Sequence, residues 1–466
     1  MRERNRHGAL FRPFLAAVLL LSLLALPVRG TGAEEETYIV QYKAACSSRT
    51  DSGPPFREVS RGELDRLLAE DVLEWYEPNG TAVLIDPLPA DGVSLQGVLS
   101  PWYADEMWHL DMIGAETAYE MDAAGQDVRI AVIDSGANRH PDLEGCLAEG
   151  WNYLKDNDST GDSNGHGTGV CGLIAGGGED GMVGTAPRAT LIPLKCFEGT
   201  TTKTIYVCDA IWDAVDRFHC DVINLSVGMI SDSLALREAV THAMENGVIV
   251  VAAVGNGGTR TKHYPAFYDD VIGVAEVDSS GLVYKNSNHN ESVLLTAPGA
   301  QVRSLSYLGG YDTFTGCSFA TPLVTGTVAD LLSMEPDLTR QEISAILTET
   351  AMDRGKPGWD EYYGWGILNL RGCVQSLASG FRLLPVETET GAPQISALNH
   401  TEKETVCRIL SAAYDGDGRQ TGVSVQTLRL PPGGREVLEL PPETDRVFLC
   451  DGDLRPLTSA LEIPQK

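Results

Sequence analysis

Basic residues are scarce in this sequence relative to acidic ones. The 466 residues include 35 Lys and Arg against 65 Asp and Glu, which gives a formal net charge of -30 at pH 7. A protein that binds nucleic acid needs clustered Lys and Arg to displace the counterions of the phosphate backbone. The charge balance therefore argues against a nucleic-acid partner. It agrees with a soluble chain, and the same negative field would favour basic substrates.

Common metal and redox motifs are also missing. None of the ten cysteines forms a CxxC pair, so a zinc ribbon or a thiol redox site has no support. No HExxH spacing indicates a zinc peptidase. Disulfides are permitted in an exported chain, but the scattered cysteines do not resemble a small disulfide scaffold, and we predict no particular pairing.

Long apolar runs are rare as well, and the one candidate for a membrane segment extends from Phe14 to Val28. It follows a basic start and precedes small residues near Gly30 to Ala33, which is the pattern of a secretion signal. The run is shorter than the roughly 18 to 20 residues that a membrane span needs. We therefore predict a signal peptide over 1–33 and a secreted or cell-surface extracellular protein. An uncleaved anchor is the alternative, and only then would the chain contact a membrane.

The length of the chain exceeds what one hydrophobic core usually supports, so we expect several folded units. Segment 34–99 combines strand-like stretches at 37–43 and 81–88 with a helical stretch at 61–72, which predicts a small α+β domain. Residues 87–101 are rich in Pro, Gly, Ser and Asp and predict an exposed connector that is open to proteolysis.

Segment 100–379 alternates short apolar strands with helices. The strands lack the alternation of half-buried strands, which favours a parallel sheet that is buried on both faces. We predict an α/β domain with a mostly parallel sheet flanked by helices. The expected strands cover 128–136, 189–197, 221–228, 247–256 and 270–278, and two of the expected helices cover 204–218 and 233–247.

Segment 380–466 changes to alternating apolar and polar residues with turn signals at 415–418 and 431–434. This pattern predicts a small C-terminal antiparallel β domain, similar to a β-sandwich. The pattern is compatible with two roles for this domain, a stabilising appendage and a surface-binding module.

Three segments place polar side chains where strands end or helices begin. Asp134 ends the strand at 128–136, His166 lies between two glycines at the head of an apolar helical run, and Ser318 lies at the entrance of another apolar helix. Taken alone, each has a structural interpretation: a turn cap, a structural histidine and a helix N-cap. Together they supply the acid, imidazole and hydroxyl that nucleophilic catalysis needs.

The order Asp, His, Ser differs from the orders in chymotrypsin and in α/β-hydrolases, and no GxSxG surrounds Ser318. The stretches AVIDSGANRHPDL, NGHGTGVCG and GCSFATPLVTG resemble the three signature regions of the subtilisin-like serine proteases. The resemblance runs from about 102 to 373. It implies that Asp134, His166 and Ser318 form a catalytic triad.

Further site residues follow from this resemblance. VVAAVGNGG is similar to the family's oxyanion-hole region, so Asn256 would donate its amide to the developing oxyanion. NLSVG resembles the strand that pairs with substrate, which assigns Ser226, Val227 and Gly228 to the cleft. KHYPAF matches the pocket floor, where His263 would shrink the pocket and favour small or acidic residues before the scissile bond.

Other positions are departures from the family pattern or a partial match to it. Cys317 stands where the family usually has Thr, which would weaken the oxyanion hole, and Gly169 would widen the cleft near His166. Asp142, Glu179 and Asp180 fall where relatives bind structural calcium, and they offer the oxygens that this ion prefers.

The resemblance implies a serine endopeptidase that cuts protein or peptide substrates through an acyl-enzyme intermediate, with no cofactor for catalysis. Segment 34–99 would be the propeptide of a zymogen, an intramolecular inhibitor that is cut off on maturation. We expect a monomer. The alternative is a non-catalytic binding protein with the same fold, although all four catalytic positions are filled.

Overall fold

The computed structural model describes residues 36–43, 53–85, 107–177, 181–378, 380–386, 393–399, 403–416, 419–432, 434–452, 454–455, 457 and 461–463. The predicted signal peptide and the connector at 87–101 lie outside these residues. Within the described parts of the chain, no helix combines the length and apolar character that a membrane crossing requires.

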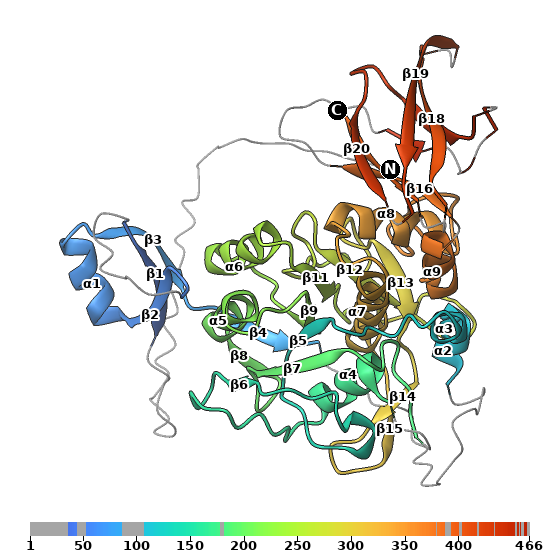
Figure 1. Ribbon diagram of the computed structural model, residues 1–466. Helices are drawn as coiled ribbons and strands as arrows, with labels where there is room; N and C mark the ends of the chain where they lie inside the picture. The colour runs from blue at the N-terminus through green and yellow to red at the C-terminus, as the bar shows by residue number, and fades with distance from the viewer. Residues whose placement is uncertain are drawn as a thin grey trace, which may run out of the picture.

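A parallel sheet forms the centre of the molecule (Figure 1). Its strands are β5 (Arg129–Asp134), β6 (Trp151–Asn152), β7 (Thr190–Lys195), β9 (Val222–Leu225), β11 (Ile249–Ala253), β12 (Ile272–Val277) and β13 (Leu295–Pro298). They lie in the order β13-β12-β11-β9-β5-β7-β6, and every pair is parallel. The five predicted strands are all present, whereas the sequence did not reveal β6 and β13.

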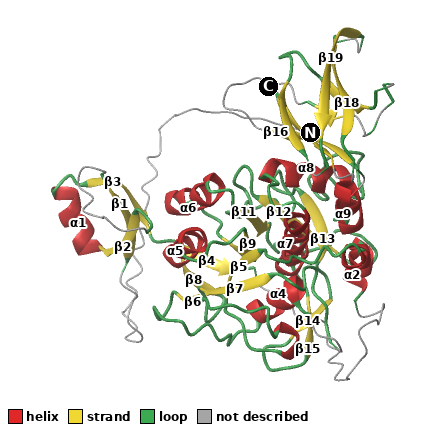
Figure 2. Cartoon of the chain, in the orientation of Figure 1, coloured by secondary structure: helices red, strands yellow, loops and turns green. Residues whose placement is uncertain are grey.

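Helices cover both faces of this sheet (Figure 2). The four long helices beside it are α4 (His166–Ala175), α5 (Thr204–Asp216), α6 (Leu234–Glu245) and α7 (Cys317–Met334). Successive side chains of β5 point to opposite faces: Ile130 and Val132 pack in the core with α4 and α7, and Ala131 and Ile133 pack in the core with α5 and α6. The strands read as continuous apolar runs because both faces are buried.

Further helices and a hairpin complete this region. They are α2 (Trp108–Ile113), α3 (Ala115–Glu120), the 3-10 turn η1 (Pro141–Leu143), the hairpin of β14 (Val302–Leu305) with β15 (Tyr311–Phe314), α8 (Arg340–Thr350) and α9 (Leu370–Ala378). The result is the predicted α/β class with a mostly parallel sheet.

A small N-terminal unit precedes the central region (Figure 1, blue). It contains β1 (Thr37–Tyr42), β2 (Phe56–Ser60), α1 (Arg61–Ala69) and β3 (Leu73–Pro78). The strands form an antiparallel sheet in the order β2-β1-β3, and α1 packs Leu64 and Leu67 against it. Ser60 caps α1 by accepting a hydrogen bond from the Glu63 N–H at 3.3 Å.

The predicted strand at 81–88 has a different partner from the one its position suggests. It is β4 (Thr81–Leu84), and it leaves the N-terminal sheet to pair with β8 (Thr201–Lys203) and β10 (Val227–Gly228) of the central region. The order of this second sheet is β10-β4-β8, and both pairs are antiparallel. The strand that follows the N-terminal unit therefore attaches this unit to the central region.

The C-terminal unit consists of two antiparallel sheets, as predicted. Its strands are β16 (Phe381–Val386), β17 (Gln394–Asn399), β18 (Thr405–Tyr414), β19 (Gln420–Leu430), β20 (Arg435–Glu439), β21 (Arg446–Cys450) and β22 (Leu461–Glu462). The sheets β16-β17-β20 and β19-β18-β21-β22 share an apolar core that includes Ile395, Ile409 and Leu449. Arg435 on β20 pairs with the buried Glu342 of α8 at 2.6 Å, which anchors this unit on the central region.

Candidate active site

Asp134 and His166 lie together at the carboxyl end of β5. The two carboxylate oxygens of Asp134 lie 2.8 and 2.9 Å from His166 Nδ1, and both side chains are completely buried. A carboxylate only accepts hydrogen bonds, so Nδ1 carries the proton and Nε2 is the basic nitrogen. The backbone N–H of Ser135 also donates to Asp134, at 2.6 Å. This carboxylate is therefore fixed in position by contacts within the protein itself.

Glycine is required where the two segments meet. A Cβ on Gly167 would lie 2.1 Å from the carbonyl oxygen of Gly136 and 3.0 Å from Asp134 Oδ1. No side chain fits at that spacing, so the start of α4 can approach the turn after β5 only with glycine at this position. The approach is what brings His166 to Asp134.

Asp162 holds the loop before His166, and sequence reasoning missed it. Its buried carboxylate accepts hydrogen bonds from the N–H groups of Asn164, Gly165 and Thr168, each at 2.9 Å. The Ser135 hydroxyl donates to the same carboxylate at 2.9 Å and accepts from the Gly167 N–H at 2.9 Å. The acid in GDSNGHG, four residues before the histidine, was the available signal.

Ser318 lies in the first turn of α7 and is fully buried. Its hydroxyl donates to the carbonyl oxygen of Ile85 and, at 3.4 Å, to that of Ser226. The next residue, Phe319, places its ring 5.1 Å from the His166 ring. The start of α7 and the start of α4 are thus neighbours, which brings the hydroxyl to the region of the acid and the imidazole.

Asn256 joins the same group from the loop after β11. Its side-chain oxygen accepts a hydrogen bond from the Cys317 N–H at 2.9 Å, and its Nδ2 donates to the carbonyl oxygen of Ile85 at 3.4 Å. A single peptide carbonyl, that of Ile85, therefore receives both the Ser318 hydroxyl and the Asn256 amide. This arrangement can polarise a carbonyl that is under attack by the serine oxygen.

The predicted substrate-binding residues contact the segment that ends in Ile85. Val227 and Gly228 of β10 pair with Leu84 and Val83 of β4. The Ser226 carbonyl accepts from the Ile85 N–H at 3.2 Å. The cleft therefore binds an extended chain by main-chain hydrogen bonds, and in this structure that chain is the protein's own β4.

His263 lies beside the Ile85 side chain. A Cβ on Gly228 would lie 2.6 Å from His263 Nδ1 and 3.1 Å from Ile85 Cδ1, and a Cβ on Gly255 would lie 2.9 Å from His263 Nε2. His263 thus fills space between two glycines of the cleft wall. Burial lowers the pKa of its imidazole, which favours the neutral ring.

The Cys317 thiol points away from the carbonyl of Ile85. Its Sγ donates to the Gly255 carbonyl at 3.3 Å and lies 3.4 Å from the Ser287 hydroxyl. Burial raises the pKa of this thiol, so it remains protonated at physiological pH. Cys317 therefore supports the loop that carries Asn256 and does not act as a nucleophile.

The expected widening of the cleft at Gly169 is wrong. A Cβ there would lie 3.0 Å from the Phe314 ring and 3.2 Å from the Phe319 ring, so aromatic side chains already fill that space. The Phe314 ring comes from the β14–β15 hairpin, which the sequence did not predict.

The predicted calcium ligands are described only in part, because Glu179 and Asp180 lie outside the described residues. Asp142 is buried, and its Oδ2 accepts hydrogen bonds from the Met182 N–H at 2.8 Å and from the Tyr311 hydroxyl at 2.9 Å. Both donors bind Oδ2, which is one of the two carboxylate oxygens that a cation could use. Across the residues that the structure covers, no group of three or more His, Cys, Asp or Glu side chains could hold a metal ion.

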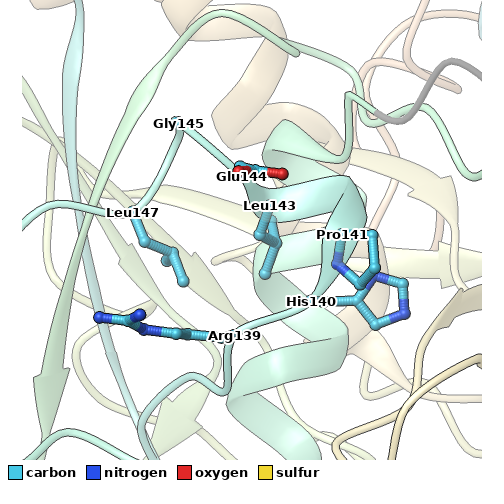
Figure 3. A pocket seen from close by; sticks show the side chains of 7 residues that line it. All are labelled: Arg139, His140, Pro141, Leu143, Glu144, Gly145 and Leu147. Atoms are coloured by element: carbon cyan, nitrogen blue, oxygen red, sulfur yellow. The ribbon is translucent and has the colours of Figure 1, made fainter.

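A surface pocket of about 480 Å³ lies beside this position (Figure 3). Its walls come from the single segment that follows the turn after Asp134. They consist of Arg139, His140, Pro141, Leu143, Glu144, Gly145 and Leu147. None of them contributes to the Asp134, His166 and Ser318 group.

The cysteines do not form disulfides in the parts of the chain that the structure describes. Nine of them are free and buried, and the tenth, Cys46, lies outside the described residues. Eight of these thiols act as small apolar side chains in the cores of the central region and of the C-terminal unit.

Comparisons with known proteins identify the family to which the chain is similar. A family model described as "Subtilase family" matches residues 125–366. The thermostable alkaline protease of Halalkalibacterium halodurans is 31% identical over 322 residues, which cover 68% of this chain and 82% of that protein. Thermitase of Thermoactinomyces vulgaris is 33% identical over 280 residues, which cover 59% of this chain and 98% of thermitase.

A solved structure shows a similar fold over most of the chain. The crystal structure of fervidolysin from Fervidobacterium pennivorans, titled a keratinolytic enzyme related to subtilisin, matches with a TM-score of 0.65 and 26% identity. The match covers 91% of this chain and 72% of fervidolysin.

Proposed function

The chain belongs to the subtilase family and is a subtilisin-like serine endopeptidase, and from this premise we propose that Asp134, His166 and Ser318 are its catalytic triad. One observation carries the proposal: the carbonyl oxygen of Ile85 receives the Ser318 hydroxyl and the Asn256 amide together. A substrate carbonyl in that place would meet the nucleophile and an oxyanion donor at once.

The proposed reaction proceeds through an acyl-enzyme. His166 Nε2 takes the proton of the Ser318 hydroxyl as its oxygen attacks the carbonyl carbon, and Asp134 stabilises the imidazolium that forms. The C–N bond breaks while the imidazolium gives that proton to the leaving amine. A water molecule then loses a proton to His166 and attacks the ester. The acid product leaves, and the proton returns to the Ser318 oxygen.

Asn256 would hold the developing negative charge during both attacks. Its orientation is supported by the hydrogen bond that its side-chain oxygen accepts from the Cys317 N–H. The backbone N–H of Ser318 at the start of α7 is the natural second donor, because the first N–H groups of a helix lack partners within the helix.

We further propose that segment 34–85 is a propeptide that inhibits the enzyme by occupying its own cleft. The N-terminal unit caps two helices of the central region. Glu77 accepts hydrogen bonds from the Ser233 hydroxyl at 2.7 Å and from the Leu234 and Ala235 N–H groups at 2.9 and 3.1 Å, at the start of α6. Asn79 accepts from the Ile205 N–H in the first turn of α5, at 3.3 Å.

The same contacts support a cut between Ile85 and Asp86. β4 is held between β8 and β10, and its pairing brings the Ile85 carbonyl to the Ser318 hydroxyl. The self-cleavage point would therefore directly precede the connector predicted at 87–101. The position of Ile85 leads us to propose that branched aliphatic residues are also accepted before the scissile bond, beside the small or acidic residues predicted from the sequence, with His263 limiting the depth of the subsite.

N-terminal sequencing of the wild type and of Ser318→Ala tests both parts of this proposal. The wild type should yield a mature chain that begins at Asp86 and should react with a fluorophosphonate probe. Ser318→Ala should keep its propeptide joined and should neither react with the probe nor cleave peptides. Ser333→Ala, at the far end of α7, is the matched control and should behave as the wild type. Peptide cleavage by Ser318→Ala would refute the triad, and a mature N-terminus elsewhere would refute the cut site alone.

The remaining assignments are proposals that rest on the sequence. We propose that residues 1–33 direct export of a monomeric enzyme, and that the C-terminal unit either stabilises the enzyme or binds a surface. Deletion of the residues after 379 separates these two roles, because loss of a surface function alone would leave peptide cleavage intact. The calcium set Asp142, Glu179 and Asp180 stays a prediction in which Asp142 would offer Oδ1, because its Oδ2 already accepts two hydrogen bonds.

A further inference from the structure

Glu276 is a buried acid directly behind the nucleophile turn. It occupies the end of β12, in a strand whose residues are all buried, and its own exposure is 0%. Val274 and Ile272, two and four residues before it, pack in the core that α7 covers. Because side chains alternate along a strand, Glu276 continues that apolar stripe toward the start of α7.

The contacts around Glu276 join it to the turn that precedes Ser318. A Cβ on Gly299 would lie 2.7 Å from the Glu276 Cβ and 2.8 Å from the Gly316 carbonyl oxygen. Gly299, Glu276 and Gly316 are therefore packed closely together. The Gly316 N–H donates to the Gly299 carbonyl at 3.0 Å. The Glu276 N–H donates to the Ser287 hydroxyl at 3.2 Å, and that hydroxyl lies 3.4 Å from Cys317 Sγ.

The carboxyl group has no compensating charge. Among the described residues, neither of its oxygens has a hydrogen-bond partner of good geometry. The titratable group that faces it from α7 is the Cys317 thiol. In the loop after β12, Asp278 and Tyr284 are the nearest titratable residues in the sequence, and the Asp278 carboxylate is engaged by the N–H groups of Ser280 and Leu282. The paired positions of β13, Ala297 and Pro298, are not titratable.

Burial raises the pKa of Glu276 to about 8, and the Gly316 backbone amide offsets this only in part. The side chain is therefore mostly neutral at pH 7. Ionised, it would place a negative charge behind the turn that has to stabilise the negative oxyanion. In a buried site with little screening, two like charges oppose each other strongly.

We propose that Glu276 is a positioning residue of the oxyanion hole, which supports catalysis only in its neutral form and sets the upper pH limit of the enzyme. The inference rests on the proposed function, since it requires that Asn256 and the Ser318 N–H stabilise an oxyanion. Glu276 does not touch the substrate. It acts through Gly316 and Cys317, whose N–H is the donor that orients Asn256.

The test is the pH dependence of kcat/KM between pH 6 and 10, measured on the mature enzyme with an uncharged peptide that carries Ile before the scissile bond. The wild type should lose about tenfold in kcat/KM for each pH unit above the ionisation of Glu276. Glu276→Gln keeps the shape of the neutral acid. Its kcat/KM should stay constant to a pH at least one unit higher than in the wild type. Asp337→Asn removes an exposed acid in the turn after α7 and should keep the wild-type profile.

Two further measurements separate the possible failures. The rate at which a fluorophosphonate labels wild-type Ser318 should fall over the same pH range, and this holds even if Glu276→Gln does not fold. A labelling rate that stays constant to pH 10, or an alkaline limb that is identical in Glu276→Gln and the wild type, would overturn the role of Glu276. Activity of Ser318→Ala would instead overturn the proposed function.

Discussion

The side-chain oxygen of Asn256 accepts a hydrogen bond from the backbone N–H of Cys317 at 2.9 Å. This bond points the amide nitrogen of Asn256 toward the carbonyl that the Ser318 hydroxyl contacts. The loop after β11 and the start of α7 are therefore held together by a hydrogen bond within the protein itself. Such preorganisation lets the donor act without rearrangement during the reaction.

Asn256→Ala should lower kcat by about 100- to 1000-fold, because it removes one oxyanion donor. KM should change little, since the donor acts mainly on the charge that develops in the transition state. Steady-state kinetics of the mature enzyme measure both parameters. Asn246→Ala, on the exposed turn after α6, is the control. Equal losses in kcat and in substrate affinity would mean that Asn256 serves binding instead.

Glu77→Ala should accelerate release of the propeptide by about tenfold, because a charged cap at a helix start contributes about 1–2 kcal/mol. The lag before activity appears after refolding of the full chain measures this release. Glu74→Ala is a matched control, since Glu74 is an exposed residue of the same strand. If Glu77→Ala kept the wild-type lag, the contacts with α6 would not determine inhibition.

The parallel strands and the three catalytic segments could be predicted because each has a local pattern. The apolar run that ends in Asp134 and the one that follows His166 keep that pattern whatever lies around them. The pairing of β4 could not be predicted in this way. Residues 81–88 show a strand pattern, but nothing in them specifies β8 and β10 as partners, because such pairing depends on contacts over more than 100 residues.

The burial of single polar residues was also beyond the sequence. Glu276 interrupts an apolar strand, and the pattern alone does not reveal that α7 covers its face of the sheet. Gly169 suggested an open cleft because the Phe314 ring that fills the space comes from a distant hairpin. In the sequence, Asp162 is indistinguishable from an exposed loop acid, and only the structure reveals the five hydrogen bonds that its carboxylate accepts.

His263→Gly should shift the preference before the scissile bond from Ile toward Phe. Removal of the imidazole frees the space between Gly228 and Gly255 that a longer side chain needs. Differences of a few methylene groups in such subsites change kcat/KM by about 10- to 200-fold. The ratio of kcat/KM for matched Ile and Phe peptides measures the shift. Lys262→Ala alters the exposed neighbour of His263 and should leave the ratio unchanged. An unchanged ratio in His263→Gly would show that the histidine does not limit the subsite.

Chelation should leave the melting temperature of Ser318→Ala unchanged if Asp142 is bound as the structure shows. Its Oδ2 is already occupied by the Met182 N–H and the Tyr311 hydroxyl. Melting curves with excess chelator, with and without added calcium, measure this, because a ligand that binds only the folded state raises the melting temperature. A calcium-dependent rise that Asp142→Asn abolishes would restore Asp142 as a ligand.

Asp330→Asn should make the stability of the protein less sensitive to alkaline pH. Asp330 is fully buried in α7, and burial raises the pKa of its carboxyl well above the usual range, although the positive charge of Arg188 opposes the shift. A raised pKa in the folded state means that the folded protein holds a proton that the unfolded chain releases. Protonated Asp330 therefore contributes its full stabilisation at a pH below the pKa of this carboxyl in the unfolded chain. The contribution is lost as the pH rises through the pKa of the same carboxyl in the folded protein.

The measurement is the melting temperature of Asp330→Asn and of its parent between pH 5 and 10, in the Ser318→Ala background, which prevents self-digestion. The parent should lose more stability over this range, and each kcal/mol of the difference should appear as about 2–4 °C. Asp337→Asn, an acid in the turn after the same helix, should follow the parent, because an exposed carboxylate has a similar proton affinity in both states. Parallel curves for Asp330→Asn and the parent would show that Asp330 carries no proton when folded, and that a cation or water satisfies it within α7.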